Sequence, residues 1–379
     1  FQYFHYFYTM LFSEVIGQSE LKSQLIHEVN ADKISHAQLF VGKSGYGTLP
    51  LTLAFIQFIM CENRQETDSC GTCPSCQKNR KQQHPDVHFS FPTVQAISKT
   101  ATPLLGDWRE QIAETSYFDL NSWIKKSDDK ERKPIISVHE SQEIIKKLSL
   151  RSYEGGYKIM VIWQPEEMNV SCANKLLKIL EEPPARTLFI LVAESHEKML
   201  QTILSRAQTV HVPRLKLEEI TGYLMGEKQL VRDFAESVAA RSDGDLIEAI
   251  EISGNGDEKN ENYLQFTQLM RVCYKKNVID MMDWGESISS RSKEGQKEFL
   301  KYALHMFRQS ILRNYTEDHL TRVSQDEDGF LGNFSKFITG NNIQDFFKSF
   351  NDAHYYLDRN ANSKILFTNL CFQVMRFIH

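Results

Sequence analysis

Continuous apolar runs alternate with helical patterns between residues 15 and 212, and this alternation is the feature that most limits the fold. Uninterrupted apolar runs are typical of parallel strands that are buried on both faces. The alternation therefore predicts an α/β domain with a parallel sheet between two layers of helices. The expected strands are 37–41, 135–138, 157–163, 187–192 and 209–212, and the expected helices are 49–59, 141–148, 169–181 and 197–204.

The pattern changes along the chain and predicts further domains. After residue 213 the strand signals stop, and 217–253 is typical of three short helices. Residues 254–262 are rich in Gly, Asn and charge, which indicates a linker, and helical patterns with aromatic stripes continue to the end. We expect an α/β domain at 11–212, a small helical domain at 213–260 and a larger helical domain at 261–379.

Two segments depart from this plan. Residues 1–10, which end at Met10, are strongly aromatic, and we interpret them as a non-native or disordered tail. They lack the basic start and small-residue cleavage site of a secretory signal. Residues 91–133 break the strand and helix rhythm, so we expect an insertion on the surface of the α/β domain, helical around 108–113.

Charge and hydropathy exclude two classes of protein. The formal net charge is −5, which argues against a protein whose whole surface binds nucleic acid. No apolar run approaches the roughly 20 residues that a membrane helix needs. With no export signal in the sequence, we expect a cytoplasmic protein.

A degenerate phosphate-binding loop follows the first expected strand. The motif G-x-x-x-x-G-K-[ST] uses its Lys to reach phosphates and its hydroxyl to hold Mg²⁺. Here Gly42 and Gly47 match, but Thr48 stands at the Lys position and Leu49 at the hydroxyl position. A second nucleotide element would be an apolar strand with an acid at its tip, whereas 159–162 leads to Gln164. We therefore expect no ATP binding.

Four of the seven cysteines lie close together, with the spacing C-x8-C-x2-C-x2-C. Paired Cys-x-x-Cys turns and four thiolates match the tetrahedral S₄ shell of structural zinc. An iron–sulfur cluster, a redox pair and ordinary buried thiols are the alternatives. We expect a closed structural zinc module at 61–76, with the ligands Cys61, Cys70, Cys73 and Cys76.

Several strings together resemble the delta-prime subunits of bacterial DNA polymerase III clamp loaders, in the AAA+ superfamily. The resemblance is dense from 15 to 212 and thin beyond, and the order and spacing of the strings make it specific. The strings are His36-Ala37-Gln38-Leu39-Phe40, the cysteine module, His84-Pro85-Asp86-Val87, Leu148-Ser149-Leu150, residues 153–159, 173–184 and 187–192, Thr202-Ile203-Leu204-Ser205-Arg206, and Arg359-Asn360-Ala361-Asn362.

The resemblance implies roles for particular residues. In this family a Ser-Arg-Cys motif supplies an arginine finger to a neighbouring ATPase, and here it reads Ser205-Arg206-Ala207. Arg206 is thus the expected finger in trans, although alone it would be read as a surface salt-bridge residue. A second sensor arginine of the superfamily would fall where Ile247 stands.

The resemblance also implies domains, partners and activity. The helical domains would be the lid and the collar of an AAA+ subunit. The partners would be the tau/gamma ATPase subunits, the delta subunit, the sliding clamp and primer–template DNA. The isolated chain would not be an enzyme but part of the DNA-directed DNA polymerase III holoenzyme.

Two other functions stay open at this point. One is an active AAA+ ATPase of DNA replication or repair with unusual motifs, which nucleotide titration would reveal. The other is a zinc-dependent nucleic-acid-binding module. Lys78, Arg80 and Lys81 would suit such a module, but no aromatic residues are interleaved with them.

Overall fold

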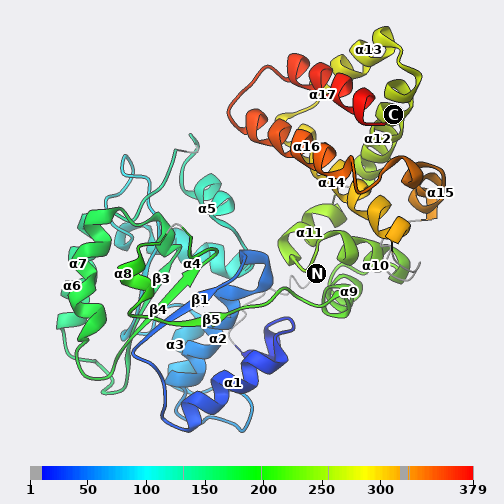
Figure 1. Ribbon diagram of the computed structural model, residues 1–379. Helices are drawn as coiled ribbons and strands as arrows, with labels where there is room; N and C mark the ends of the chain where they lie inside the picture. Colours follow the sequence, from blue (N-terminus) through cyan, green and yellow to red (C-terminus); the bar gives the residue numbers. More distant parts are fainter. Residues whose placement is uncertain are drawn as a thin grey trace, which may run out of the picture. The chain divides into compact units, whose positions relative to one another are not determined.

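The computed structural model describes residues 11–130, 132–197, 199–254, 256–315, 323 and 325–378. It divides into two compact units (Figure 1). One consists of Phe1–Glu227 and Asp243–Glu248, and the other of Lys228–Ser242 and Ala249–His379. The expected tail at 1–10 lies outside the described residues. The division into three domains at 212 and 260 stays a prediction.

A five-stranded parallel sheet forms the centre of the first unit. Its register pairs Leu39 with Leu191 and Thr209, and Val161 with Ile190. The prediction of a parallel α/β sheet is therefore confirmed. In spatial order the strands are β2 (Val87–Ser90), β3 (Lys158–Trp163), β4 (Thr187–Ala193), β1 (Ala37–Val41) and β5 (Gln208–His211).

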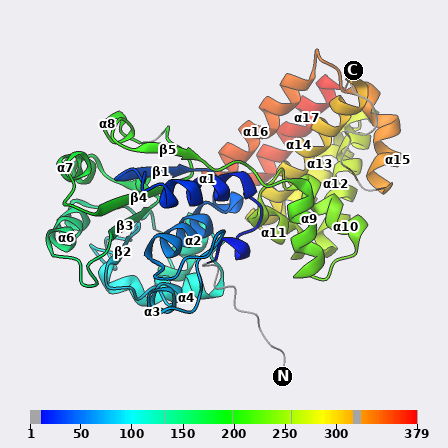
Figure 2. The ribbon, with the colours of Figure 1, turned by 90° about the horizontal axis from the view of Figure 1, so that it is seen from below.

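Helices cover both faces of this sheet, because neighbouring strand residues point to opposite sides. Phe40 packs in one core cluster with α1 (Ser19–Asn30) and α2 (Thr48–Met60). Leu39, the preceding residue, packs in another with α6 (Val138–Ser149) and α7 (Val170–Glu181). Figures 1 and 2 show these two helical layers on either side of the strands.

Two expected elements were wrong, and one strand was missed. Residues 135–138 form no strand, since Ile135 and Ile136 make only isolated bridges and α6 begins at Val138. The expected helix at 197–204 is the short α8 (Gln201–Leu204), with residue 198 not described. The edge strand β2 is only four residues long and begins two residues after a proline, so its local signal is weak.

The segment 91–133 is not a surface insertion, because its aromatic side chains are part of the core. It contains η3 (Thr102–Leu104), α4 (Leu105–Glu114) and α5 (Leu120–Ser127). Trp108 stacks on Phe91 with ring centroids 4.5 Å apart and lies 5.3 Å from Trp163 of β3. Burying such large aromatic rings is strongly favourable, and this draws the segment onto the sheet.

All described elements of the second unit are helical, and its core is largely aromatic. Phe299, Phe307, Phe346 and Phe350 are all buried there, so the aromatic stripes of these helices form the core. The expected linker at 254–262 is wrong, since the backbone is helical from Gly256 onward. The helices of this part are α10 (Arg232–Arg241), α11 (Leu246–Gly254, which begins in the first unit), α12 (Gly256–Lys275), α13 (Val278–Ser289), α14 (Lys293–Tyr315), α15 (Gln325–Phe334), α16 (Ile343–Asp358) and α17 (Ser363–Phe377).

The remaining helices are short. Within the described residues, none of the helices is both long and apolar enough to cross a membrane. The remaining elements are α3 (Pro74–Arg80), α9 (Leu217–Gly226), η1 (Phe12–Glu14), η2 (Ser44–Tyr46), η4 (Pro165–Glu167) and η6 (Ser335–Phe337).

Candidate functional site

The degenerate phosphate loop lies between β1 and α2, where a phosphate-binding loop would be placed. Gly42 continues the strand, since its amide donates to the carbonyl of Ala193 in β4 at 3.1 Å. Gly47 has a φ of +87° and leads directly into α2. A positive φ suits glycine because it has no Cβ. The backbone shape of a strand, tight turn and helix is thus retained.

The two replaced motif positions carry no group that is free to bind phosphate or Mg²⁺. The Thr48 hydroxyl lies 3.1 Å from the carbonyl oxygens of Gly42 and of Lys43, so it donates back to the loop itself. Thr48 is 1% exposed. Leu49 is buried in the core between α2 and the sheet. Both residues therefore stabilise the loop rather than offer ligands.

Two carboxylates from distant segments lie against the loop. Glu194, directly after β4, accepts hydrogen bonds from the hydroxyl of Ser44 at 2.5 Å and from its amide at 3.3 Å. Asp245 lies so close to Gly45 that a Cβ there would overlap its Oδ1. Loop amides of this kind cradle anionic phosphates in nucleotide-binding proteins. Here the protein's own anionic groups occupy that environment.

The strand tip at β3 has an acid nearby that the sequence pattern did not reveal. Gln164 itself ends the strand in a left-handed conformation with a φ of +55°. Glu166 lies two residues further on and accepts the amide hydrogens of Glu194 at 2.8 Å and Ser195 at 3.4 Å. Burial raises the pKa of Glu166 to about 7. The pairing of β3 with β4 brings this carboxyl next to Glu194, which in turn contacts Ser44 of the loop.

Two further residues complete the surroundings of the loop. Ile247, at the expected position of a sensor arginine, has its amide nitrogen 3.1 Å from where a Cβ on Gly45 would lie. The residue at this position is therefore an isoleucine, which carries no cation that could serve nucleotide chemistry. Tyr117, from the segment 91–133, lies against Gly47, and no local sequence signal indicated this.

The four clustered cysteines converge as their spacing predicted. Their Sγ atoms all lie within 4.8 Å of one another, with Cys61 and Cys70 3.6 Å apart and Cys70 and Cys76 4.0 Å apart. A tetrahedral metal with sulfur ligands at about 2.3 Å requires sulfur–sulfur distances of about 3.8 Å. The four thiols can therefore hold a metal ion with little rearrangement.

Helix ends and backbone amides orient the sulfur atoms of this cluster. Cys61 ends α2, and Cys73 caps α3, whose first residue is Pro74. The amides of Cys70, Cys73 and Cys76 donate to the sulfurs of Cys61, Cys70 and Cys73 at 3.3–3.4 Å. Hydrogen bonds from the backbone of Thr72 and Cys73 lower the pKa of Cys70 to about 6. Burial raises the pKa of Cys61 and of Cys76, and a nearby cation would favour their thiolate forms.

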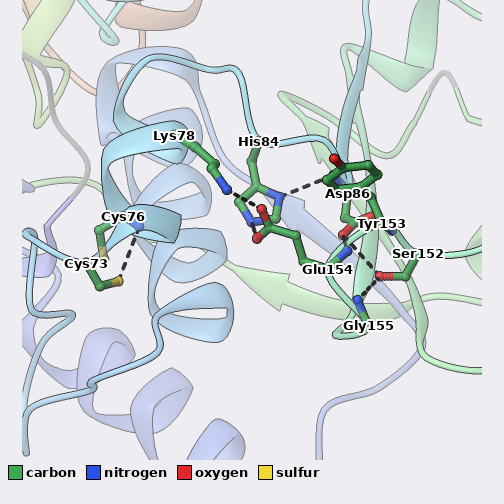
Figure 3. Close-up of polar contacts among 9 residues, drawn as sticks. All are labelled: Cys73, Cys76, Lys78, His84, Asp86, Ser152, Tyr153, Glu154 and Gly155. Carbon is green, nitrogen blue, oxygen red and sulfur yellow. Dashed lines mark hydrogen bonds and ion pairs between the residues drawn. The ribbon is translucent and has the colours of Figure 1, made fainter.

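The cysteine module is connected to the sheet through the loop 152–155 (Figure 3). Lys78 of α3 forms an ion pair with Glu154, and Nε2 of the buried His84 lies 3.0 Å from the same carboxylate. Asp86 accepts hydrogen bonds from the amides of Tyr153 and Glu154 at 2.6 and 2.8 Å. Two of the strings that carry the family resemblance are thus in direct contact.

These hydrogen bonds control the ionisation of Asp86. Burial alone would raise its pKa, but the amides of Glu154 and Tyr153 and the hydroxyl of Ser152 outweigh burial and lower the pKa below its ordinary value. A carboxylate whose pKa is lowered in the folded state stabilises the protein above its unfolded pKa of about 3.9. That stabilisation is lost as the pH falls through the folded-state pKa.

We predict that Asp86→Ala lowers the free energy of unfolding by about 3 kcal/mol at pH 7, because two amides and the Ser152 hydroxyl in part-buried hydrogen bonds lose a charged acceptor. The difference from the wild type should shrink below about pH 4. Urea denaturation at pH 7 and at pH 3 measures both values. Asp129→Ala, at an exposed position, is the control. A difference that is the same at both pH values would contradict the ionic role of Asp86.

Arg206 lies just after α8, next to Ser205, at the surface of the first unit. Its Nη2 and Nε atoms donate to Oε2 of Glu181 in α7 at 3.0 and 3.2 Å, and Nη1 donates to the carbonyl of Thr202 at 2.9 Å. The side chain of Arg206 is 29% exposed and that of Glu181 is 59% exposed. Arg206 thus lies in the connection between α8 and β5, whereas the phosphate loop lies in the connection between β1 and α2.

Comparison with known proteins gives consistent matches. A family model described as "DNA polymerase III, delta subunit" matches residues 17–216, more than half of the chain. Subunit delta' of DNA polymerase III from Bacillus subtilis is 27% identical over 259 residues, 68% of this chain and 66% of the relative. The Escherichia coli subunit delta' is 22% identical and covers 85% of this chain and 82% of the relative.

A tau subunit is also similar to this chain. Subunit tau of DNA polymerase III from B. subtilis is 23% identical, covering 94% of this chain and 60% of the relative. The chain therefore spans less than two thirds of the length of both B. subtilis relatives.

Proposed function

Because the chain belongs to the family of DNA polymerase III delta-prime clamp-loader subunits, we propose that it acts as a subunit that does not hydrolyse ATP. It would assist the ATP-driven loading of the sliding clamp onto primer–template DNA. Its partners would be the tau/gamma ATPase subunits and the delta subunit, in the cytoplasm. The isolated chain would not be an enzyme.

The observation that carries this proposal is the occupied phosphate loop. Glu194 and Asp245 place two carboxylates against Ser44 and Gly45. Electrostatic repulsion between these carboxylates and a triphosphate disfavours binding, in addition to the missing Lys and hydroxyl. An active ATPase needs the opposite arrangement, with cations and Mg²⁺ ligands around the phosphates. This argues against the alternative of an active ATPase.

We predict that the isolated wild-type chain shows no Mg-ATP binding by titration calorimetry, up to a nucleotide concentration of about 1 mM. At this concentration a ligand with a millimolar Kd would still be detected as half-saturation. A catalytically active tau subunit titrated in the same buffer is the positive control. A micromolar affinity in the wild-type chain would refute the proposed function.

Arg206 is the proposed contribution of this chain to catalysis. An arginine supplied across a subunit boundary stabilises charge on the transferring phosphoryl group. The geometry that supports this role is a planar guanidinium at the surface, held in place by Glu181 and by the carbonyl of Thr202. Ser205 is the adjacent motif residue, and its hydroxyl lies 3.3 Å from Nη1.

Zinc is the metal that we propose for the cysteine cluster. Four sulfur ligands, buried or nearly so, form a closed shell that suits Zn²⁺ and leaves no position for a substrate. When bound, the ion would neutralise thiolates and stabilise the local fold. A separate role as a nucleic-acid-binding module has less support, because Lys78 is already paired with Glu154.

A further inference from the structure

We propose that the segment 91–133 carries an internal plug, in which Tyr117 occupies the space beside Gly47 that a bound nucleotide would need. This inference rests on the proposed function and deepens it, because it assigns a cause to the absence of nucleotide binding. It also gives the segment a role that its sequence did not suggest.

Tyr117 contacts the phosphate loop at Gly47, the loop residue with a positive φ. A Cβ added to Gly47 would lie 3.2 Å from both Cε1 and Oη of Tyr117. The ring therefore packs directly on a glycine whose backbone, in a functional loop, must be open to phosphates. The phenol oxygen also accepts the amide hydrogen of Ile16 at 3.0 Å, which joins the ring to the segment preceding α1.

Packing of the neighbouring residue in the aromatic core fixes the position of Tyr117. The following residue, Phe118, is buried and lies 5.5 Å from Trp108 and 5.1 Å from Trp163, measured between ring centroids. The backbone amide of Tyr117 donates to the hydroxyl of Thr115 at 3.1 Å. Burial raises the pKa of Tyr117, so the phenol stays neutral. Tyr117 is thus fixed in place by the same packing that draws the segment onto the sheet.

Three separate segments fill three adjacent places on the loop. Tyr117 lies on Gly47, Asp245 lies on Gly45, and Glu194 binds the amide and hydroxyl of Ser44. Each occupant comes from a part of the chain at least 70 residues away in sequence. Restoring the missing motif residues should therefore not be enough to restore nucleotide binding.

The first experiment repairs the motif with the plug in place and then without it. Thr48→Lys with Leu49→Thr restores the Lys and the hydroxyl, and Tyr117→Ala with Asp245→Ala is then added. We expect no Mg-ATP binding by calorimetry for the repaired variant. The fourfold variant should bind at least about tenfold more tightly, because the space is open and one negative charge is gone. Equal affinity of the two variants would overturn the plug.

The second experiment does not depend on a gain of Mg-ATP binding, and it leaves the core residue Leu49 unchanged. Hydrogen exchange is measured on amides of 15–18 and 42–49 in the wild type, Tyr117→Phe and Tyr117→Ala. Tyr117→Phe should expose the Ile16 amide while the loop stays protected. Tyr117→Ala should raise exchange in 42–49 by about tenfold, because local opening becomes easier.

The control is Tyr153→Ala, since Tyr153 is 83% exposed and lies in the loop that contacts the cysteine module. It should leave exchange in 42–49 unchanged. If Tyr117→Ala also leaves exchange at 15–18 and 42–49 unchanged, Tyr117 does not hold the loop and the proposal fails. Nucleotide binding by the wild-type chain would instead refute the proposed function, so the two failures are distinguishable.

Discussion

Replacing Arg206 by alanine is expected to lower the rate of clamp loading by the assembled complex at least about tenfold, because a phosphoryl-transfer site loses its arginine finger. Total ATP hydrolysis should fall only partly, since any further ATPase sites of the proposed complex would not receive this arginine. Clamp loading onto primer–template DNA is therefore the sharper measurement. Arg206→Lys should restore little, because an ammonium group lacks the planar fork that binds phosphate oxygens.

The fold should tolerate this change, which separates catalysis from stability. The ion pair between Arg206 and Glu181 is solvent-exposed, and such pairs contribute at most about 1 kcal/mol. Thermal unfolding and assembly should therefore match the wild type. Arg232→Ala is the matched control, since Arg232 is an exposed arginine 3.7 Å from Glu236. If the Arg206→Ala complex loads clamps at the wild-type rate, Arg206 is only a surface residue.

Removal of the metal is expected to have the largest effect on stability. We predict one zinc ion per chain by metal analysis, and local unfolding of 61–80 on chelation, because metal binding and folding are coupled at such sites. Loss of about 3 kcal/mol would lower the Tm by roughly 6–12 °C. Cys73→Ser should reproduce the loss of zinc and the faster hydrogen exchange of α3.

The cysteines outside the cluster provide the control for this experiment. Cys172→Ala removes a buried thiol of α7 and should leave the zinc content at one ion per chain. The prediction would be contradicted if protein purified without metal exchange contained no zinc, or if it contained iron with visible charge-transfer absorption.

The contacts around the cysteine module indicate that a metal bound there would also affect the sheet. Lys78 and His84 both contact Glu154, and Asp86 holds the backbone of the same loop. Loss of order in α3 removes one of these contacts and exposes the others. We therefore expect that chelation increases hydrogen exchange at 152–155 as well as in the module.

Local patterns predicted those parts of the protein that depend on neighbouring residues. β1, β3 and β4 were recognisable because each is a continuous apolar run, and α7 because Asn169 caps it and prolines follow it. The cysteine cluster was recognisable because its spacing by itself limits the possible geometry. The missing Lys and hydroxyl at Thr48 and Leu49 could also be read directly, since that motif is a contiguous string.

Weak local signals account for the errors. β2 is short and lies at an edge, and Ile135 and Ile136 resemble a strand although their neighbours allow only isolated bridges. The segment 91–133 has little periodicity, so its sequence did not show that Trp108 and Trp123 would be buried against Trp163 and Phe91. Burial of this kind depends on which distant segments pack against the aromatic side chain in the folded protein.

By itself, the sequence determined the α/β class of the first unit, the converging cysteines and the loss of the nucleotide-binding side chains, because each depends on periodicity or on a contiguous motif. Only the tertiary structure decided what stands in the phosphate loop. Tyr117, Glu194 and Asp245 reach it from three segments far apart in the chain. Their meeting depends on strand order and on the packing of aromatic residues, which no local pattern encodes.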